Sequence, residues 1–206
     1  MTATEIIENA KKYLSYKYLY GYKGETITKE QNAQLTKLYP RIWGQTIYKT
    51  NSTLWANNKN KAIDCSGLVC RAAGIPDIGS YQMEEHWKST KEEQPGAVLW
   101  REGHVAIIIK PGLLIEASGI KTGVRVRTYS LGEFVKILLI PNVDYATQQN
   151  GWLNDGVGWH YIKNGAYLKD GYYKLAWSGG TNLFYFDANG YCIITDANGV
   201  IKEPRG

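Results

Sequence analysis

The spacing of apolar residues predicts two helices within the first forty positions. Thr2 and Glu5 have the spacing of a capping box, which opens a helix. The apolar residues that follow share one helical face: Ile6, Ile7, Ala10 and Leu14. A second helix is predicted over residues 28–38, where Pro40 ends it. Residues 44–61 are polar and irregular, which predicts a loop.

A short buried helix and a series of strands are predicted after this loop. Asp64 has the place and side chain of an N-cap, apolar residues continue to Ala73, and Gly74 is a typical residue to end a helix. Strand-like runs follow a turn at residues 94–96 and cover 97–100, 104–109, 113–117, 123–128 and 136–140. Helices that precede a meander of strands are typical of an α+β fold.

The character of the chain changes after residue 143. Residues 144–150 have the composition of a linker, and residues 151–206 are rich in tryptophan and tyrosine. Within this tail an aromatic-x-aromatic segment leads to Asn164-Gly165 and a similar one to Asn189-Gly190, 25 residues later. This repeated signal predicts a small array of β-hairpins. We therefore expect a domain over residues 1–143, the linker, and a repeat module over residues 151–206.

Composition and charge exclude several classes of protein. The net charge of the 206 residues is +5, and residues 1–145 carry all of it, with 19 Lys and Arg against 14 Asp and Glu. A mildly basic front domain fits an anionic partner such as a wall that bears teichoic acid, or is only a solvated surface. It contains no clustered basic stripe of the kind that binds nucleic acid. No apolar run approaches the ~20 residues that span a membrane.

The cysteine pattern leaves room for a reactive thiol. The chain contains Cys65, Cys70 and Cys192, an odd and low number that argues against a disulfide framework. Because no CxxC or HxxxH spacing occurs, we expect no metal site, and we expect no cofactor. The N-terminus lacks the basic start and apolar block of a secretory signal, so we expect the protein to be made in a cytoplasm.

Three residues suggest nucleophilic chemistry. Cys65 is predicted at the first turn of a helix, where N–H groups favour a thiolate and can hold an oxyanion. His104 begins a predicted strand and is placed to act as base, and Glu116 lies on the next strand, where it can orient the imidazole. Taken singly, each has an ordinary structural interpretation: a buried thiol, a strand-end histidine and a solvent-facing acid. Together they predict a thiol hydrolase, whereas His86 and His160 are interpreted as ordinary residues.

Four segments carry a resemblance to a known family. The segments 64–69 (DCSGLV), 95–96, 103–105 (GHV) and 115–119 resemble the NlpC/P60 family of peptidoglycan hydrolases in order and spacing over residues 5–142. The resemblance implies a papain-like α+β fold, with helices packed on an antiparallel sheet, and cleavage of peptide or amide bonds in bacterial wall peptides. It assigns the nucleophile to Cys65, the base to His104 and the third polar position to Glu116, where many members carry His, Asn or Gln.

The same resemblance suggests three further site residues. Tyr18 stands in a Tyr-x-aromatic-Gly setting and is the candidate for a hydroxyl near the oxyanion, or else a packing residue. Asp64 either contacts an amino group of the substrate or only caps its helix. Ser66 contributes a hydroxyl or its backbone N–H.

The tail resembles choline-binding, or cell-wall-binding, repeats. In that family, rings from neighbouring hairpins enclose the trimethylammonium group of choline on teichoic acids by cation–π attraction. The candidate ligand-binding residues are Trp152, Trp159, Tyr172 and Trp177. Tyr172 and Phe184 stand where tryptophan is usual, and the rings are alternatively the core of the module itself. Because two hairpins are marginal alone, the module is expected to pair with another copy or with the front domain.

These features together predict a two-part wall lytic enzyme similar to a phage endolysin. Such a protein is made in the host cytoplasm without a signal peptide and reaches the bacterial wall after release. The same three residues serve a γ-D-glutamyl endopeptidase or an N-acetylmuramoyl-L-alanine amidase. A wall-binding protein with an inert hydrolase domain and an intracellular acyltransferase are the alternatives.

Overall fold

The chain divides into two compact units, Met1–Tyr145 and Ala146–Gly206. The computed structural model describes residues 1–145, 151–154, 156–163, 166–177, 180–195 and 201–202. Asp144, which the sequence places in the linker, pairs with Thr2 in an isolated β-bridge and so belongs to the first unit. Of the predicted linker, residues 146–150 lie outside the described part.

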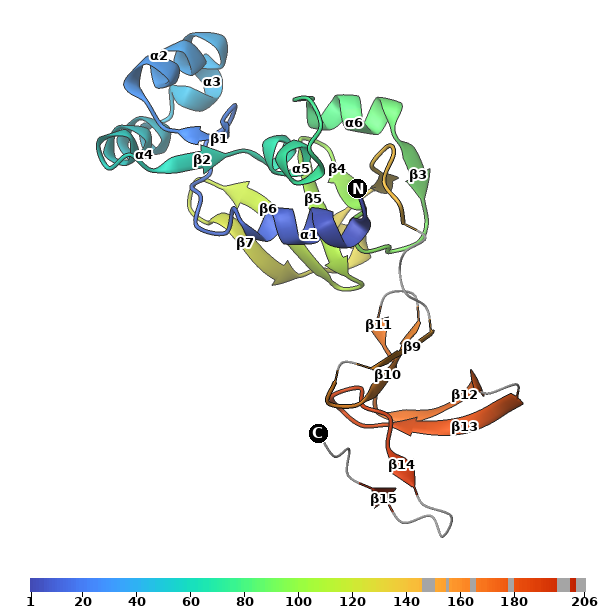
Figure 1. The fold of residues 1–206 in the computed structure, drawn as a ribbon. Coiled ribbons are helices and arrows are strands. Elements are labelled where there is room, and N and C mark those ends of the chain that lie inside the picture. The colour runs from blue at the N-terminus through green and yellow to red at the C-terminus, as the bar shows by residue number, and fades with distance from the viewer. Residues whose placement is uncertain (146–150, 155, 164–165, 178–179, 196–200, 203–206) are drawn as a thin grey trace. The chain divides into compact units, whose positions relative to one another are not determined.

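A six-stranded antiparallel sheet forms the framework of the first unit (Figure 1). Its strands, in spatial order, are β3 (Lys88–Thr90), β8 (Lys136–Leu139), β4 (Val98–Arg101), β5 (His104–Lys110), β6 (Leu113–Gly119) and β7 (Gly123–Thr128). The five predicted strands correspond to all of these except β3. A 3-10 turn, Leu131–Glu133, precedes β8.

Helices pack on one face of this sheet and confirm the predicted α+β class. They are α1 (Ala3–Lys11), α5 (Cys65–Ala73) and α6 (Ser80–His86). The capping box of α1 is present, with Thr2 as N-cap, although Leu14 lies beyond the helix and is exposed. Ile6 of α1, Leu68 of α5 and Val105 of β5 belong to one buried core between helices and sheet. A second apolar cluster, which includes Ala106, lies on the opposite face of β5.

A small helical insertion has its own core. It contains β1 (Lys23–Thr26), α2 (Lys29–Leu38), α3 (Pro40–Trp43), α4 (Thr46–Asn57) and β2 (Lys61–Ile63), and β1 pairs with β2. Leu19, Tyr22, Trp43 and Tyr48 are buried in this core. The prediction of a loop over residues 44–61 was therefore wrong. α4 has few apolar positions, and it is stabilised by side chains that lie far from it in the sequence.

The second unit consists of short antiparallel strands. They are β9 (Gly151–Asn154), β10 (Trp159–Lys163), β11 (Ala166–Tyr167), β12 (Gly171–Trp177), β13 (Gly180–Phe186), β14 (Ile194–Thr195) and β15 (Ile201–Lys202). Hairpin β12–β13 pairs over seven residues, and β10 pairs with both β9 and β11. The predicted turn at Asn164-Gly165 lies outside the described residues, whereas Gly190 adopts the positive φ of 87° that its turn requires.

Candidate active site in the first unit

Cys65 is the first residue of helix α5, as the sequence predicts. Asp64 is the N-cap, and its carboxylate accepts the Gly67 N–H at 2.7 Å. Only 6% of Cys65 is exposed, and the backbone N–H groups of Val105 and Ser66 hydrogen-bond its sulfur. Val105 follows His104 on β5, so the sulfur lies at the beginning of the strand that carries the histidine.

His104 and Glu116 form a buried hydrogen-bonded pair. His104 Nε2 lies 2.8 Å from Glu116 Oε2, and the two residues are 8% and 1% exposed. Because an ionised carboxylate only accepts hydrogen bonds, the neutral imidazole carries its proton on Nε2 and its lone pair on Nδ1. Glu116 therefore holds the ring in the form whose Nδ1 can accept a proton.

Two arginines hold the other oxygen of Glu116. Arg125 donates to Oε1 from Nε and Nη2 at 3.0 and 2.9 Å, and Arg127 donates from Nε at 2.8 Å. Arg125 lies directly opposite Glu116 in the register of β6 and β7. Neither arginine was predicted from the sequence. The alternation of valine and arginine over residues 124–127 was the available signal, since it places both guanidinium groups on one face of a strand.

The electrostatic environments of Glu116 and Cys65 differ. Burial raises the pKa of Glu116, but the hydrogen bonds from His104, Arg127 and Arg125 outweigh it and hold that pKa well below its ordinary value. Burial, followed by the charge of Asp64, raises the pKa of the Cys65 thiol to about 11, against the smaller opposite effects of the N–H groups and Lys23. Cys65 is therefore a neutral thiol at pH 7, and not the thiolate that its helix position alone predicts.

Tyr18 packs beside the cysteine. Its side chain contacts the core cluster that includes Cys65. Burial, and after it the charge of Cys65, raises the pKa of the Tyr18 hydroxyl, which therefore stays protonated and able to donate a hydrogen bond. The structure thus brings Tyr18 to the same site as Cys65.

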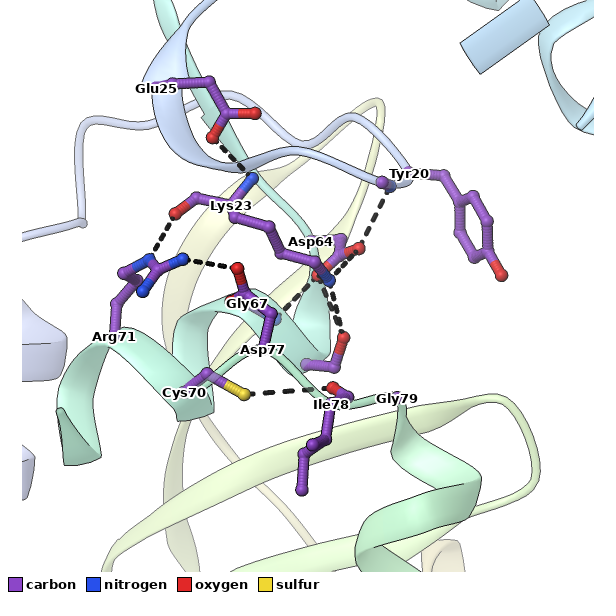
Figure 2. Close-up of polar contacts among 12 residues, drawn as sticks. Tyr20, Lys23, Glu25, Asp64, Gly67, Cys70, Arg71, Asp77, Ile78 and Gly79 are labelled. Carbon is purple, nitrogen blue, oxygen red and sulfur yellow. Dashed lines mark hydrogen bonds and ion pairs between the residues drawn. The ribbon is translucent and has the colours of Figure 1, made fainter. Parts of the chain in front are cut away.

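Asp64 and Ser66 are joined by a lysine that sequence analysis missed. Lys23 Nζ lies 2.8 Å from both carboxylate oxygens of Asp64 and 2.9 Å from Ser66 Oγ (Figure 2). Ser66 Oγ in turn donates to Asp64 Oδ1 at 3.1 Å. The helix cap predicted as the minimum role of Asp64 is present. No local signal pointed to Lys23, because 41 positions separate it from Asp64.

In the second unit, three of the four predicted ligand-binding rings come together. Trp152 lies 4.9 Å from Trp177 and 6.4 Å from Trp159, centroid to centroid, with interplanar angles of 73° and 82°. Trp159 and Trp177 are 5.5 Å apart at 80°. Together with Phe184 and Cys192, these rings line a cavity of about 190 Å³. Trp152 and Trp159 also pack against the buried cluster of Leu175, Phe186 and Cys192, so they contribute to the core of this unit as well as to the cavity.

Tyr172 is not part of this cluster. On strand β12 the side chains alternate, so that Tyr173, Leu175 and Trp177 share one face and Tyr172 points to the other. Tyr172 is 71% exposed and pairs across the hairpin with Tyr185 at 4.9 Å. His160, interpreted as an ordinary residue, is buried, with Nδ1 2.7 Å from the Gly190 carbonyl and its ring stacked on Tyr167.

The described residues contain no group of three or more His, Cys, Asp or Glu side chains that could hold a metal ion. Their helices include none that is long and apolar enough to cross a membrane. All three cysteines are free and buried.

A scan of protein-family models and a search of curated proteins gave no match. Solved structures that resemble the chain include the NlpC/P60 domain of the peptidoglycan hydrolase SagA, at 19% identity and a TM-score of 0.44, covering 68% of this chain and 100% of that one. They also include the peptidoglycan hydrolase RipB from Mycobacterium tuberculosis, at 19% identity and a TM-score of 0.42, where the match covers 67% of this chain and 63% of that one. A P60 domain from an M. avium subspecies paratuberculosis antigen matches at 17% identity and a TM-score of 0.44, over 66% and 91%.

Proposed function

We propose that the first unit is a cysteine hydrolase that cleaves peptide or amide bonds in bacterial wall peptides. The observation that carries this proposal is the 2.8 Å hydrogen bond between His104 Nε2 and Glu116 Oε2. His104 lies on β5, and the N–H of the next residue, Val105, contacts the Cys65 sulfur. A thiol, an oriented imidazole and N–H donors at a helix start are the groups that acyl transfer requires. The choice of wall peptides as substrate follows the resemblance of residues 64–69 and 103–105 to the NlpC/P60 family.

The proposed reaction begins from a neutral thiol. His104 Nδ1 accepts the Cys65 proton as the sulfur attacks the carbonyl carbon, and the N–H groups at the start of α5 and the Tyr18 hydroxyl stabilise the oxyanion. The imidazolium, held by Glu116, then gives its proton to the departing amine. Water, deprotonated by His104, hydrolyses the thioester and frees Cys65.

The test compares two cysteines of the same helix. Cys65→Ala is expected to abolish the release of new amine ends from purified peptidoglycan, whereas Cys70→Ala, which removes a buried thiol hydrogen-bonded to the Ile78 carbonyl, is expected to retain activity. Release at the wild-type rate by Cys65→Ala would refute the proposal. Mass spectrometry of the fragments decides between a γ-D-glutamyl endopeptidase and an N-acetylmuramoyl-L-alanine amidase.

The burial of Cys65, of which only 6% is exposed, favours a second candidate function, a wall-binding protein with an inert hydrolase domain. The pKa of Cys65 is raised to about 11, so attack depends on proton transfer to His104 and not on a standing thiolate. Wild-type protein that sediments with walls but releases no new amine ends would support this second candidate.

For the second unit we propose binding of a quaternary ammonium group such as the choline of teichoic acid. The perpendicular rings of Trp152, Trp159 and Trp177 around their shared cavity support this. Trp177→Ala is expected to weaken retention on choline-bearing walls, and free choline is expected to release the wild-type protein. Retention unchanged by either would exclude this ligand.

The biological setting proposed for both activities is that of a phage endolysin. The protein is made in the host cytoplasm and reaches the wall once the membrane is breached. Pairing of two copies through the second unit is a further part of this proposal, and light scattering of the full chain with and without choline tests it.

A further inference from the structure

Lys23 places an ammonium group beside the proposed nucleophile. Its Nζ contacts both carboxylate oxygens of Asp64 (Figure 2). It also contacts the hydroxyl of Ser66, so it bridges the two residues that flank Cys65 in the sequence. The side chains of Lys23 and Asp64 are 24% and 6% exposed. The ion pair is thus screened from water but reaches the edge of the surface.

The Asp64 carboxylate has no hydrogen-bonding capacity left for a ligand. Besides Lys23 it accepts the N–H of Gly67 at 2.7 Å, the N–H of Gly21 at 3.0 Å and the Ser66 hydroxyl at 3.1 Å. A carboxylate offers about four acceptor positions, and these contacts use them. An incoming ammonium group therefore has to displace Lys23.

Lys23 is held in place through its backbone as well as its side chain. Its N–H donates to Glu25 at 2.8 Å, and its carbonyl accepts from Arg71 Nε at 2.9 Å (Figure 2). Gly67 provides the space for the side chain, since a Cβ at that position would lie 2.9 Å from Lys23 Cδ. This arrangement makes displacement of Lys23 by a substrate costly.

We propose that Lys23 determines substrate specificity by supplying the cation that Asp64 and Ser66 would otherwise take from the substrate. A free amino group next to the scissile bond meets a like charge and finds no acceptor, whereas an acylated amino group carries no charge. The site is therefore built for wall peptides whose amino end near the cleaved bond is acylated. This inference rests on the proposed function, because it concerns the choice among substrates at the same cysteine.

The first test measures kcat/KM for two matched peptides, one with a free α-amino group and one with that group acetylated. The wild-type protein is expected to prefer the acetylated peptide. Lys23→Met is expected to shift the ratio toward the free amine by about tenfold, as expected for one charge-assisted contact. The control is Lys110→Met, at the opposite end of β5 from His104, which should leave the ratio unchanged. A wild-type preference for the free amine, or an equal shift in Lys110→Met, would overturn the proposal.

The second test does not depend on hydrolysis. Cationic and neutral methanethiosulfonates of similar size react with Cys65, and peptide mapping separates this reaction from those of Cys70 and Cys192. Lys23→Met is expected to raise the cationic-to-neutral rate ratio by at least about threefold, the effect of one unit charge in a water-like medium. An unchanged ratio overturns the role of Lys23. If the wild-type protein cleaves neither peptide, the proposed function is wrong. The ratio of the two labelling rates still tests whether Lys23 repels a cation at Cys65.

Discussion

Replacing Glu116 with glutamine tests the arrangement on which the proposed reaction depends. The substitution keeps the size of the side chain but removes the charge that faces His104, Arg125 and Arg127. The amide can also donate to His104 Nε2, which would place the ring proton on Nδ1, where the lone pair is needed. Because general base catalysis contributes about 10²- to 10⁴-fold, we expect kcat to fall within that range.

The effect on stability is expected to be smaller. Charged hydrogen bonds contribute about 1.5–3 kcal/mol each when buried, but the amide keeps one acceptor oxygen, and Arg125 is 41% exposed at its side chain. We therefore expect the free energy of unfolding to fall by about 1–3 kcal/mol. The pKa of Glu116 is lowered in the folded state, so its contribution is present above the unfolded value of about 4.3 and is lost as the pH falls through the folded value. The difference between wild type and Glu116→Gln should accordingly be largest above about pH 5 and shrink in acid.

Glu133→Gln is the matched control for this experiment. Glu133 Oε2 pairs with Arg127 Nη1 at 2.9 Å and does not contact His104. Steady-state hydrolysis of a soluble wall peptide and urea unfolding at pH 3–8 are the two measurements. Full activity in Glu116→Gln, or an equal loss in Glu133→Gln, would refute the assignment of Glu116 as the residue that orients the imidazole.

Two further predictions follow from burial and from strand alternation. Because burial raises the pKa of Cys65 to about 11, its alkylation by iodoacetamide, followed by peptide mapping, should be slow at pH 7 and still rising above pH 9; a plateau below pH 8 would contradict this. Trp152→Ala should destabilise the second unit by about 3–5 kcal/mol, whereas Tyr172→Ala, whose exposed ring lies on the other face of β12, should cost less than about 1 kcal/mol. Thermal unfolding followed by tryptophan fluorescence distinguishes the two, and similar losses in both would show that the face assignment is wrong.

Features governed by neighbours in the sequence were predictable. The capping box of Thr2 and Glu5 and the N-cap Asp64 depend on side chains that reach backbone groups three residues away, so the sequence pattern is sufficient. The strands β4 to β8 were predictable because apolar, β-branched runs between turns have few other interpretations. Helix α4 was not, because its apolar positions are sparse and its partners Leu19 and Tyr22 come from a distant segment.

The candidate site likewise has a part that the sequence predicts and a part that it does not. The sequence was enough to predict Cys65 at the start of a helix and the pairing of His104 and Glu116 from neighbouring strands. The ionisation of Cys65 was not predictable, since the helix terminus favours a thiolate while burial, which depends on the whole fold, opposes it and prevails. The contact of Lys23 with Asp64 and the contact of Arg127 with Glu116 were not predictable either, because they depend on strand register and on long-range packing.

The fixed charges around Cys65 are paired before any reaction occurs. Asp64 pairs with Lys23, and Glu116 pairs with Arg125 and Arg127. In the proposed reaction, transfer of a proton from Cys65 to His104 creates a pair of opposite charges, and the charge of Asp64, which Lys23 offsets only in part, still opposes the thiolate. The Cys65 thiol can be neutral at rest and still react in this proposal, because the imidazolium that forms together with the thiolate offsets the cost of burying it. In this proposal, the lysine that restricts the substrate and the arginines that fix the carboxylate serve the same end, which is to confine the change of charge to the reacting pair.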